Sequence, residues 1–128
     1  MQKSIGKKIL IAEDDALLRS VLVDSFAFEG FEVLIAGNGA EALDTALTDH
    51  PDIIMLDIQM PIMDGMEMLD NLRSDEWGKS AEVVLLTNFG DQDRVAKAME
   101  KGALVYLVKK DWKVEDIVNK VKSTLKLV

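Results

Sequence analysis

The chain has 128 residues, of which 48% are hydrophobic and 30% are charged. This length fits one domain, and the apolar content is sufficient for a packed core, which argues against disorder. The sequence has no cysteine and one histidine, which excludes disulfides, thiolate metal sites and cysteine nucleophiles and leaves almost no material for a histidine zinc site or a serine triad. The net charge of -8 argues against direct binding of nucleic acid or anionic lipid and favours binding of cations.

No segment of the sequence has the pattern of a membrane-spanning helix or a secretion signal. The apolar run 9–12 that follows the basic N-terminus ends at the acids 13–15, so it is too short for the core of a signal peptide. No run approaches the length that a membrane-spanning helix needs. We therefore expect a cytoplasmic protein that consists of a single domain over residues 1–128.

Five short apolar segments alternate with five segments of helical periodicity. Strands are predicted at 8–12, 32–36, 52–56, 82–87 and 104–108, and helices at 18–26, 40–47, 66–72, 95–99 and 114–128. Most of the predicted strands are continuous runs of Ile, Val, Leu and Met, which is typical of strands that are covered on both faces. Gly30, Pro51 and Gly102 mark the ends of three helices, whereas the last helix is expected to run to the end of the chain.

This alternation predicts an α/β fold of the (βα)5 type. We expect a doubly wound, five-stranded parallel sheet in a flavodoxin-like three-layer sandwich, with right-handed connections between the strands. Five strands favour the order 2-1-3-4-5 over the other common doubly wound order. A site is then expected at the carboxyl ends of the first and third strands, where the direction of winding reverses.

Polar side chains follow these strands at the ends that a parallel sheet brings to one edge. They are Glu13, Asp14 and Asp15 after the first strand, Asp57 after the third, Thr87 at the end of the fourth and Lys109 after the fifth. Neighbouring carboxylates repel one another, and a hard divalent cation removes this penalty. Magnesium suits best, because it takes one or two carboxylates together with phosphate oxygens. The competing interpretation is that the acids cap a helix, which accounts for Asp15 but not for Asp57.

Asp57 directly follows a buried apolar segment. A carboxylate beside a magnesium ion can act as a nucleophile toward phosphorus and form an acyl phosphate. Lys109 would neutralise charge on the transferring phosphoryl group, and Thr87 would donate a hydrogen bond to one of its oxygens. The competing interpretation for Asp57 is a strand-end acid that only faces solvent, which is the commoner position of aspartate.

Several separated motifs cover nearly the whole chain. They are residues 9–15 with Arg19, 37–39 with 41–43, 51–57, Met60-Pro61, 63–65, 85–87 and 102–109. In this order and at these spacings, they resemble the receiver domain of bacterial two-component response regulators. The strand order 2-1-3-4-5 is also that of this family, so the order and the resemblance are not independent.

The resemblance implies a magnesium-dependent phosphorylation of Asp57. Glu13 and Asp14 would hold Mg2+, with Asp57 and the main-chain carbonyl of Gln59 as further ligands. The phosphoryl group would come from a histidine kinase or a phosphotransfer protein. The domain would not be an enzyme that acts on other molecules, since it would catalyse only its own phosphorylation and dephosphorylation.

The resemblance also implies a conformational switch. Thr87 and Lys109 would contact the phosphoryl group, and Tyr106 would turn inward as Thr87 moves. Phosphorylation would then shift an existing equilibrium that the face built by the fourth helix, the fifth strand and the fifth helix reports to a partner. That partner would be an unknown downstream protein or a missing output domain, since none follows Val128, and activation would allow a homodimer.

Three positions near the site depart from the family or tune it. Lys110 stands where the family usually has proline after a cis peptide bond. A non-proline cis bond costs roughly 3–4 kcal/mol. We therefore expect a trans bond and a shifted loop that alters the reach of Lys109. Asn88 replaces a small residue and is expected to restrict access to the pocket. The bulk of Phe89 implies slow self-dephosphorylation.

Two other classes of function remain as alternatives. A haloacid-dehalogenase-type phosphatase also uses an aspartate nucleophile, but it needs a second acid two residues further on, where this chain has Gln59. A pseudo-receiver scaffold would bind partners without phosphorylation. The complete set of acids together with Thr87 and Lys109 argues against it, whereas the loss of proline after Lys109 favours it.

Overall fold

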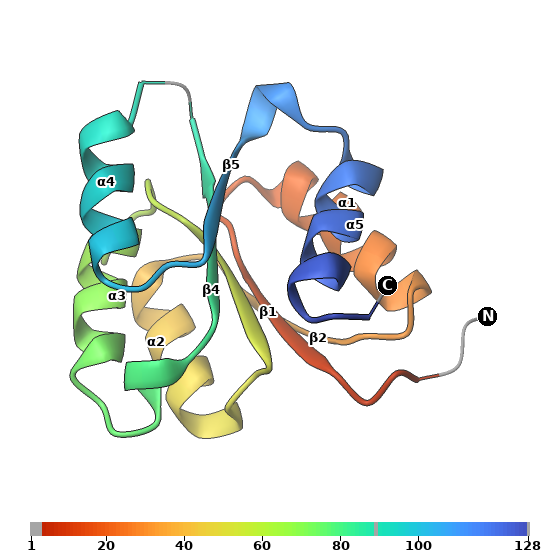
Figure 1. Cartoon of the computed structure of the whole chain (residues 1–128), viewed down its shortest axis with the longest axis horizontal. Helices are drawn as coiled ribbons and strands as arrows, with labels where there is room; N and C mark the ends of the chain where they lie inside the picture. Colours follow the sequence, from red (N-terminus) through yellow and green to blue (C-terminus); the bar gives the residue numbers. More distant parts are fainter. Residues whose placement is uncertain (1–3, 89, 128) are drawn as a thin grey trace.

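The computed structural model describes residues 4–88 and 90–127, and Figure 1 shows them as a parallel sheet between two layers of helices. The strands are β1 (Lys8–Ala12), β2 (Glu32–Ala36), β3 (Ile53–Asp57), β4 (Val83–Thr87) and β5 (Val105–Val108). The helices are α1 (Ala16–Phe28), α2 (Gly39–Asp49), α3 (Gly65–Arg73), α4 (Gln92–Glu100) and α5 (Val114–Thr124), and short 3-10 helices cover Gly78–Ser80 (η1) and Lys109–Asp111 (η2). Within this part of the chain the strand order is β2-β1-β3-β4-β5, and every pair is parallel. The predicted fold class and strand order are therefore confirmed.

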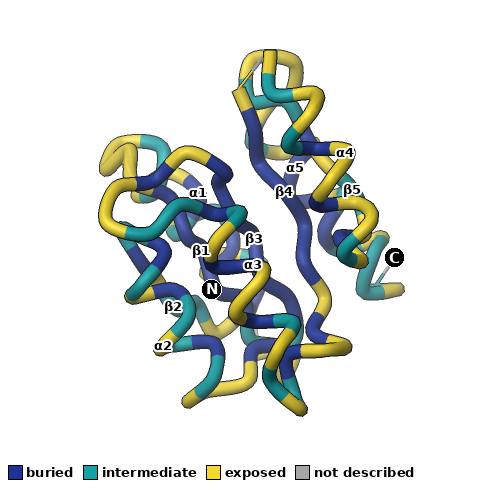
Figure 2. Tube along the Cα trace, turned by 90° about the vertical axis from the view of Figure 1, so that its left-hand side faces the viewer, coloured by how far each residue is buried: buried dark blue, intermediate teal, exposed yellow. Residues whose placement is uncertain are grey.

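The two faces of the sheet carry separate hydrophobic clusters. Helices α1 and α5 cover one face, where Phe26 and Val121 are among the buried residues, and α2, α3 and α4 cover the other, where Leu69 and Ala98 are buried. Every residue of β3 and β4 is buried, and β4 is drawn in the dark blue of buried residues in Figure 2. This two-sided burial explains why these strands are continuous apolar runs instead of alternating ones.

Capping side chains fix the starts of α1, α2 and α3, which follow the carboxyl ends of β1, β2 and β3. The Asp15 carboxylate accepts hydrogen bonds from the backbone N–H groups of Leu17 and Leu18, which confirms its expected role as the cap of α1. Asn38 caps α2, and Asp64 caps α3. These caps satisfy N–H groups that have no partner inside the helix.

The fifth helix ends earlier than predicted. It was expected to run to the end of the chain, but α5 ends at Thr124. Lys126 adopts a left-handed conformation with φ 60, its N–H donates to the carbonyl of Ser123, and the N–H of Leu127 donates to that of Lys122. These are the hydrogen bonds of a Schellman motif, and Leu127 packs against the core on the α1 and α5 side. Val128 lies outside the described residues.

None of the helices in the two described ranges is both long enough and apolar enough to cross a membrane.

Candidate functional site

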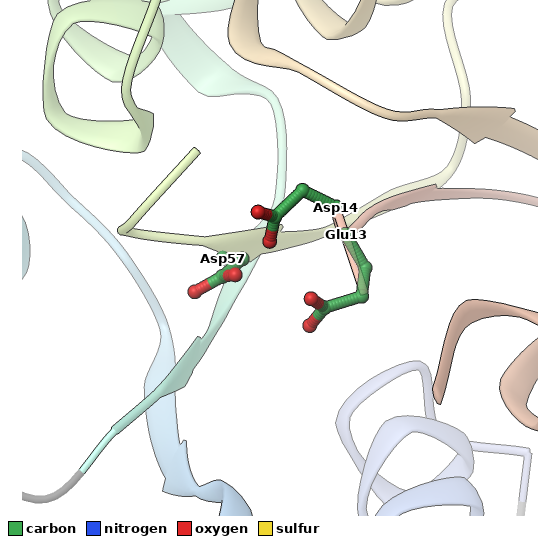
Figure 3. A group of neighbouring side chains, drawn as sticks. All are labelled: Glu13, Asp14 and Asp57. Carbon is green, nitrogen blue, oxygen red and sulfur yellow. The ribbon is translucent and has the colours of Figure 1, made fainter. Parts of the chain in front are cut away.

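Acidic side chains from two adjacent strands meet at the carboxyl edge of the sheet. Strands β1 and β3 pair with Ala12 opposite Leu56, so Glu13 and Asp14, which follow β1, lie next to Asp57, which ends β3. Figure 3 shows the three carboxyl groups at these strand ends. One oxygen from each lies within 4.8 Å of the others. The sequence prediction that these residues come together at this edge agrees with the geometry.

Glu13 is buried although it is charged, with 1% of its surface exposed. Its backbone N–H donates to the carbonyl of Ala36 at 3.1 Å, which extends the pairing of β1 with β2. Its Oε2 accepts from the N–H of Asp15 at 3.0 Å, and its Oε1 lies 2.8 Å from Lys109 Nζ. A hydrogen bond at Oε2 and an ion pair at Oε1 therefore hold this carboxylate toward the site.

Asp57 is also buried, with 2% exposed. Its Oδ1 accepts from the N–H of Gln59 at 3.3 Å, and its Oδ2 lies 3.1 Å from Lys109 Nζ. Burial, and to a lesser extent the charge of Glu13, raise the pKa of Asp57 from 3.8 to about 7, although Lys109 opposes both effects. Without a metal ion, this carboxyl group is therefore partly protonated at neutral pH.

Lys109 bridges the two buried carboxylates. Among the described residues there is no cis peptide bond, so the Lys109–Lys110 bond is trans, as expected. The ammonium nevertheless reaches both Glu13 and Asp57, so the altered reach that the missing proline suggested does not prevent contact. Burial lowers the pKa of Lys109, but the contacts with Glu13 and Asp57 outweigh burial and raise it, so the side chain is charged at neutral pH.

The remaining predicted residues lie around this centre at different depths. Thr87 ends β4 and is buried, and it pairs with Val108, the residue before Lys109. Gln59 lines the cavity above Asp57, and its side-chain carbonyl accepts from Asn88 Nδ2 at 3.3 Å. Tyr106 lies on β5 with 48% of its surface exposed. Phe89 lies outside the described residues.

The donor set fits a magnesium ion. All the side-chain atoms that could bind the metal are carboxylate oxygens, which are the ligands that hard divalent cations prefer. The Oε1 atom of Glu13 is buried, and its one contact in the described part of the chain is the Lys109 ammonium. The raised pKa of Asp57 indicates a site that gains by binding a cation. Asp14 is exposed and points into the same region, so it leaves an open side for water or substrate.

The structure adds two side chains that the sequence analysis did not place in the site. Asp64 and Arg94 line the same cavity of about 760 Å³ as Asp57, and their side chains pair at 3.4 Å. Asp64 stands in one of the quoted motifs, at the N-terminus of α3. Arg94 lies 30 residues further along, on α4, and no local pattern marks it.

Gly65 provides a test of how tightly the site is packed. It begins α3 against the end of β3, where a Cβ atom would lie 2.2 Å from the carbonyl oxygen of Asp57. Replacing Gly65 with alanine is expected to lower the free energy of unfolding by roughly 2–4 kcal/mol and to weaken Mg2+ binding, because backbone at Asp57 must move. Denaturant unfolding and Mg2+ titration would measure both effects. Gly37→Ala is the control, because its Cβ would meet only side-chain atoms at ordinary contact distance, Arg19 Nη1 at 3.5 Å and Glu41 Oε1 at 3.8 Å. Equal effects in the two variants would contradict the prediction.

Comparisons with known proteins agree with this geometry. The family model described as the response regulator receiver domain matches residues 9–122. Sporulation initiation phosphotransferase F of Bacillus subtilis is 32% identical over 123 residues, which cover 96% of this chain and 97% of that protein. Transcriptional regulatory protein PdtaR of Mycobacterium tuberculosis is 35% identical over 116 residues, which cover 90% of this chain. The chain spans only 55% of the length of PdtaR.

Solved structures show the same fold. A response regulator receiver domain protein from Methanospirillum hungatei superimposes with a TM-score of 0.85 and 26% identity, over 94% of each chain. The receiver domain of the Francisella response regulator 1452 gives a TM-score of 0.83 and 26% identity, over 94% of this chain and 98% of that one. The fold, the acidic cluster and the sequence relatives together lead to one family: the chain belongs to the receiver domains of two-component response regulators.

Proposed function

We propose that this chain accepts a phosphoryl group on Asp57 in a Mg2+-dependent reaction and uses it to switch the binding of a partner. The observation that carries the proposal is the cluster of Glu13, Asp14 and Asp57, whose oxygens lie within 4.8 Å of one another, with the Lys109 ammonium against two of them. The family is one of phosphorelay signalling domains. The donor would be a histidine kinase or a phosphotransfer protein, and one relative is itself named a phosphotransferase.

We propose for each residue the role that the family resemblance implies. Glu13, Asp14, Asp57 and the carbonyl of Gln59 would hold the metal, which neutralises charge on the transferring phosphoryl group when it is bound. Asp57 would release its proton to solvent, and one of its carboxylate oxygens would then attack phosphorus. The bond from phosphorus to the donor breaks, and the leaving group departs with the electron pair. Lys109 would move from the carboxylates to a phosphoryl oxygen.

Thr87 and Tyr106 would carry the signal away from Asp57. Both line a groove of about 390 Å³ between β5 and α4. We propose that Thr87 donates its hydroxyl to the phosphoryl group and that the ring of Tyr106, now half exposed, then turns into this groove. The groove supports the proposal because it offers room beside the ring. The population shift would alter the face formed by α4, β5 and α5.

The altered face has the character of a binding surface. Two exposed apolar side chains, Met99 of α4 and Tyr106 of β5, line the same groove on this face. We propose that a downstream protein, an output domain or a second copy of the chain binds this face, and that nucleic acid and membranes do not bind directly, given the net charge of -8. The single domain over residues 1–128 would have no catalytic activity beyond its own phosphorylation and dephosphorylation.

Intact-mass measurement after incubation with acetyl phosphate and Mg2+ tests the proposal. Wild type is expected to gain one phosphoryl group, and Asp57→Asn is expected to gain none, because it lacks the nucleophile. Asp44→Asn is the matched control, since it removes the same charge from an exposed position on α2. The chelator EDTA should prevent the gain in wild type. A gain in Asp57→Asn, or an unmodified wild type, would refute the assignment.

A turnover assay with a phosphate monoester separates the proposal from a phosphatase. A haloacid-dehalogenase-type enzyme would turn over phosphate esters many times, whereas the position that its second acid needs is occupied here by Gln59, which contacts Asn88. We expect no multiple turnover of a phosphate monoester by the wild-type chain.

A further inference from the structure

The cavity above Asp57 contains a second cationic side chain besides Lys109. Arg94, on the first turn of α4, lines this cavity. The carboxylates that line the same cavity are Asp14, Asp15, Asp57 and Asp64. Such an acidic lining repels an anionic phosphoryl donor. A cation at this position therefore bears directly on how the donor enters.

The two cations differ in how firmly they are held. Lys109 is 19% exposed and contacts two buried carboxylates at 2.8 and 3.1 Å. Arg94 is 41% exposed, and within the described ranges its side chain makes one hydrogen bond, at 3.4 Å, to Asp64 Oδ2. An exposed ion pair at this distance contributes little to stability. The weak contact with Asp64 therefore holds Arg94 in the cavity wall, and breaking this contact costs little free energy.

The partner of Arg94 has a separate structural task. Asp64 Oδ1 accepts from the N–H of Glu67 at 2.9 Å and so caps α3. The cap does not depend on Arg94, because it uses the other carboxylate oxygen. The loss of the Arg94 contact would therefore leave the start of α3 intact, and the remaining guanidinium N–H groups are available to a ligand.

The chemistry of the free donors identifies that ligand. A guanidinium is planar and offers pairs of N–H groups that match two oxygens of a phosphoryl group, with the strength of a charge-assisted hydrogen bond. We propose that Arg94 binds the non-bridging oxygens of the incoming phosphoryl group at the mouth of the Asp57 cavity, exchanging its contact with Asp64 for the donor. This inference rests on the proposed phosphorylation of Asp57 and assigns to Arg94 the recognition of its substrate.

Four variants test the inference through the second-order rate constant of phosphorylation by acetyl phosphate in saturating Mg2+. Arg94→Ala is expected to lower this constant by about tenfold, and Arg94→Lys should recover part of it. Asp64→Asn keeps the helix cap and removes the ion pair, so it should react as fast as wild type or faster. Lys97→Ala, which removes a cation from an exposed position on α4, should be unchanged. Thermal unfolding would verify that all four variants are folded.

A second measurement does not depend on the rate. The side-chain Nε–H NMR signal of Arg94, assigned by its absence in Arg94→Lys, should shift when acetyl phosphate is added to Asp57→Asn, which binds the donor but cannot react. Unchanged rates in Arg94→Ala, an equal loss in Asp64→Asn, or an unperturbed signal would overturn the inference. If wild type itself gains no phosphoryl group, the proposed function fails; if wild type reacts and Arg94→Ala reacts equally fast, only the role of Arg94 fails.

Discussion

Replacing Lys109 with alanine is expected to lower the free energy of unfolding at pH 7 by roughly 3–5 kcal/mol and to slow phosphorylation by acetyl phosphate by about a hundredfold or more. The loss of stability follows because Lys109 is the counter-charge of two buried carboxylates, Glu13 and Asp57. The loss of rate follows because no ammonium would then neutralise the transferring phosphoryl group. Denaturant unfolding and intact-mass kinetics would measure the two effects.

Added Mg2+ separates the two effects. A divalent cation also neutralises Glu13 and Asp57, so it should restore much of the stability of Lys109→Ala but not the rate. Lys113→Ala, at an exposed position before α5, removes the same charge and should change neither quantity. A Lys109→Ala protein as stable as wild type without metal would mean that the bridge contributes nothing to the folded state.

Much of this site was predictable because it depends on topology. The predicted parallel sheet brings the ends of β1, β3, β4 and β5 to one edge. Residues that follow these strands meet at this edge independently of how the helices pack. The acids after β1 and at the end of β3 therefore follow from strand positions alone. The sequence does not specify how far each side chain is buried. Glu13 is buried and Asp14 beside it is exposed, and the course of the loop after β1 sets this difference.

The features that escaped prediction depend on single backbone angles or on side-chain reach. Apolar residues continue at helical spacing beyond α5, so the periodicity extends the helix, whereas the left-handed conformation of Lys126 ends it. The contact of Arg94 with Asp64 joins residues 30 positions apart on α4 and α3, and periodicity cannot show it. The roles of Gln59, Thr87 and Tyr106 stay predictions that rest on family resemblance.

The stability of wild type relative to Asp57→Asn is expected to fall as the pH rises from about 4 to about 7, with Mg2+ absent. The pKa of Asp57 is about 7 in the folded chain and about 3.9 in an unfolded one. Between these values the folded state binds the extra proton, so removing protons favours unfolding. The stabilisation present below pH 4 is thus lost as the pH rises and is fully lost above about 7. Across this pH range, the difference in free energy of unfolding between the two proteins is expected to change by an amount on the order of 4 kcal/mol.

Denaturant unfolding of both proteins across this pH range measures the difference, and subtraction removes the contribution of carboxylates that are distant from Asp57. A pH-independent difference between wild type and Asp57→Asn would contradict the burial argument. Because the proton and Mg2+ compete for the same carboxylate, the affinity of wild type for Mg2+ should also rise with pH up to about 7 and then level off. Burial of the Asp57 carboxylate therefore both raises its pKa and favours the binding of a cation. The pH dependence of unfolding and the pH dependence of Mg2+ affinity must then give the same pKa for Asp57.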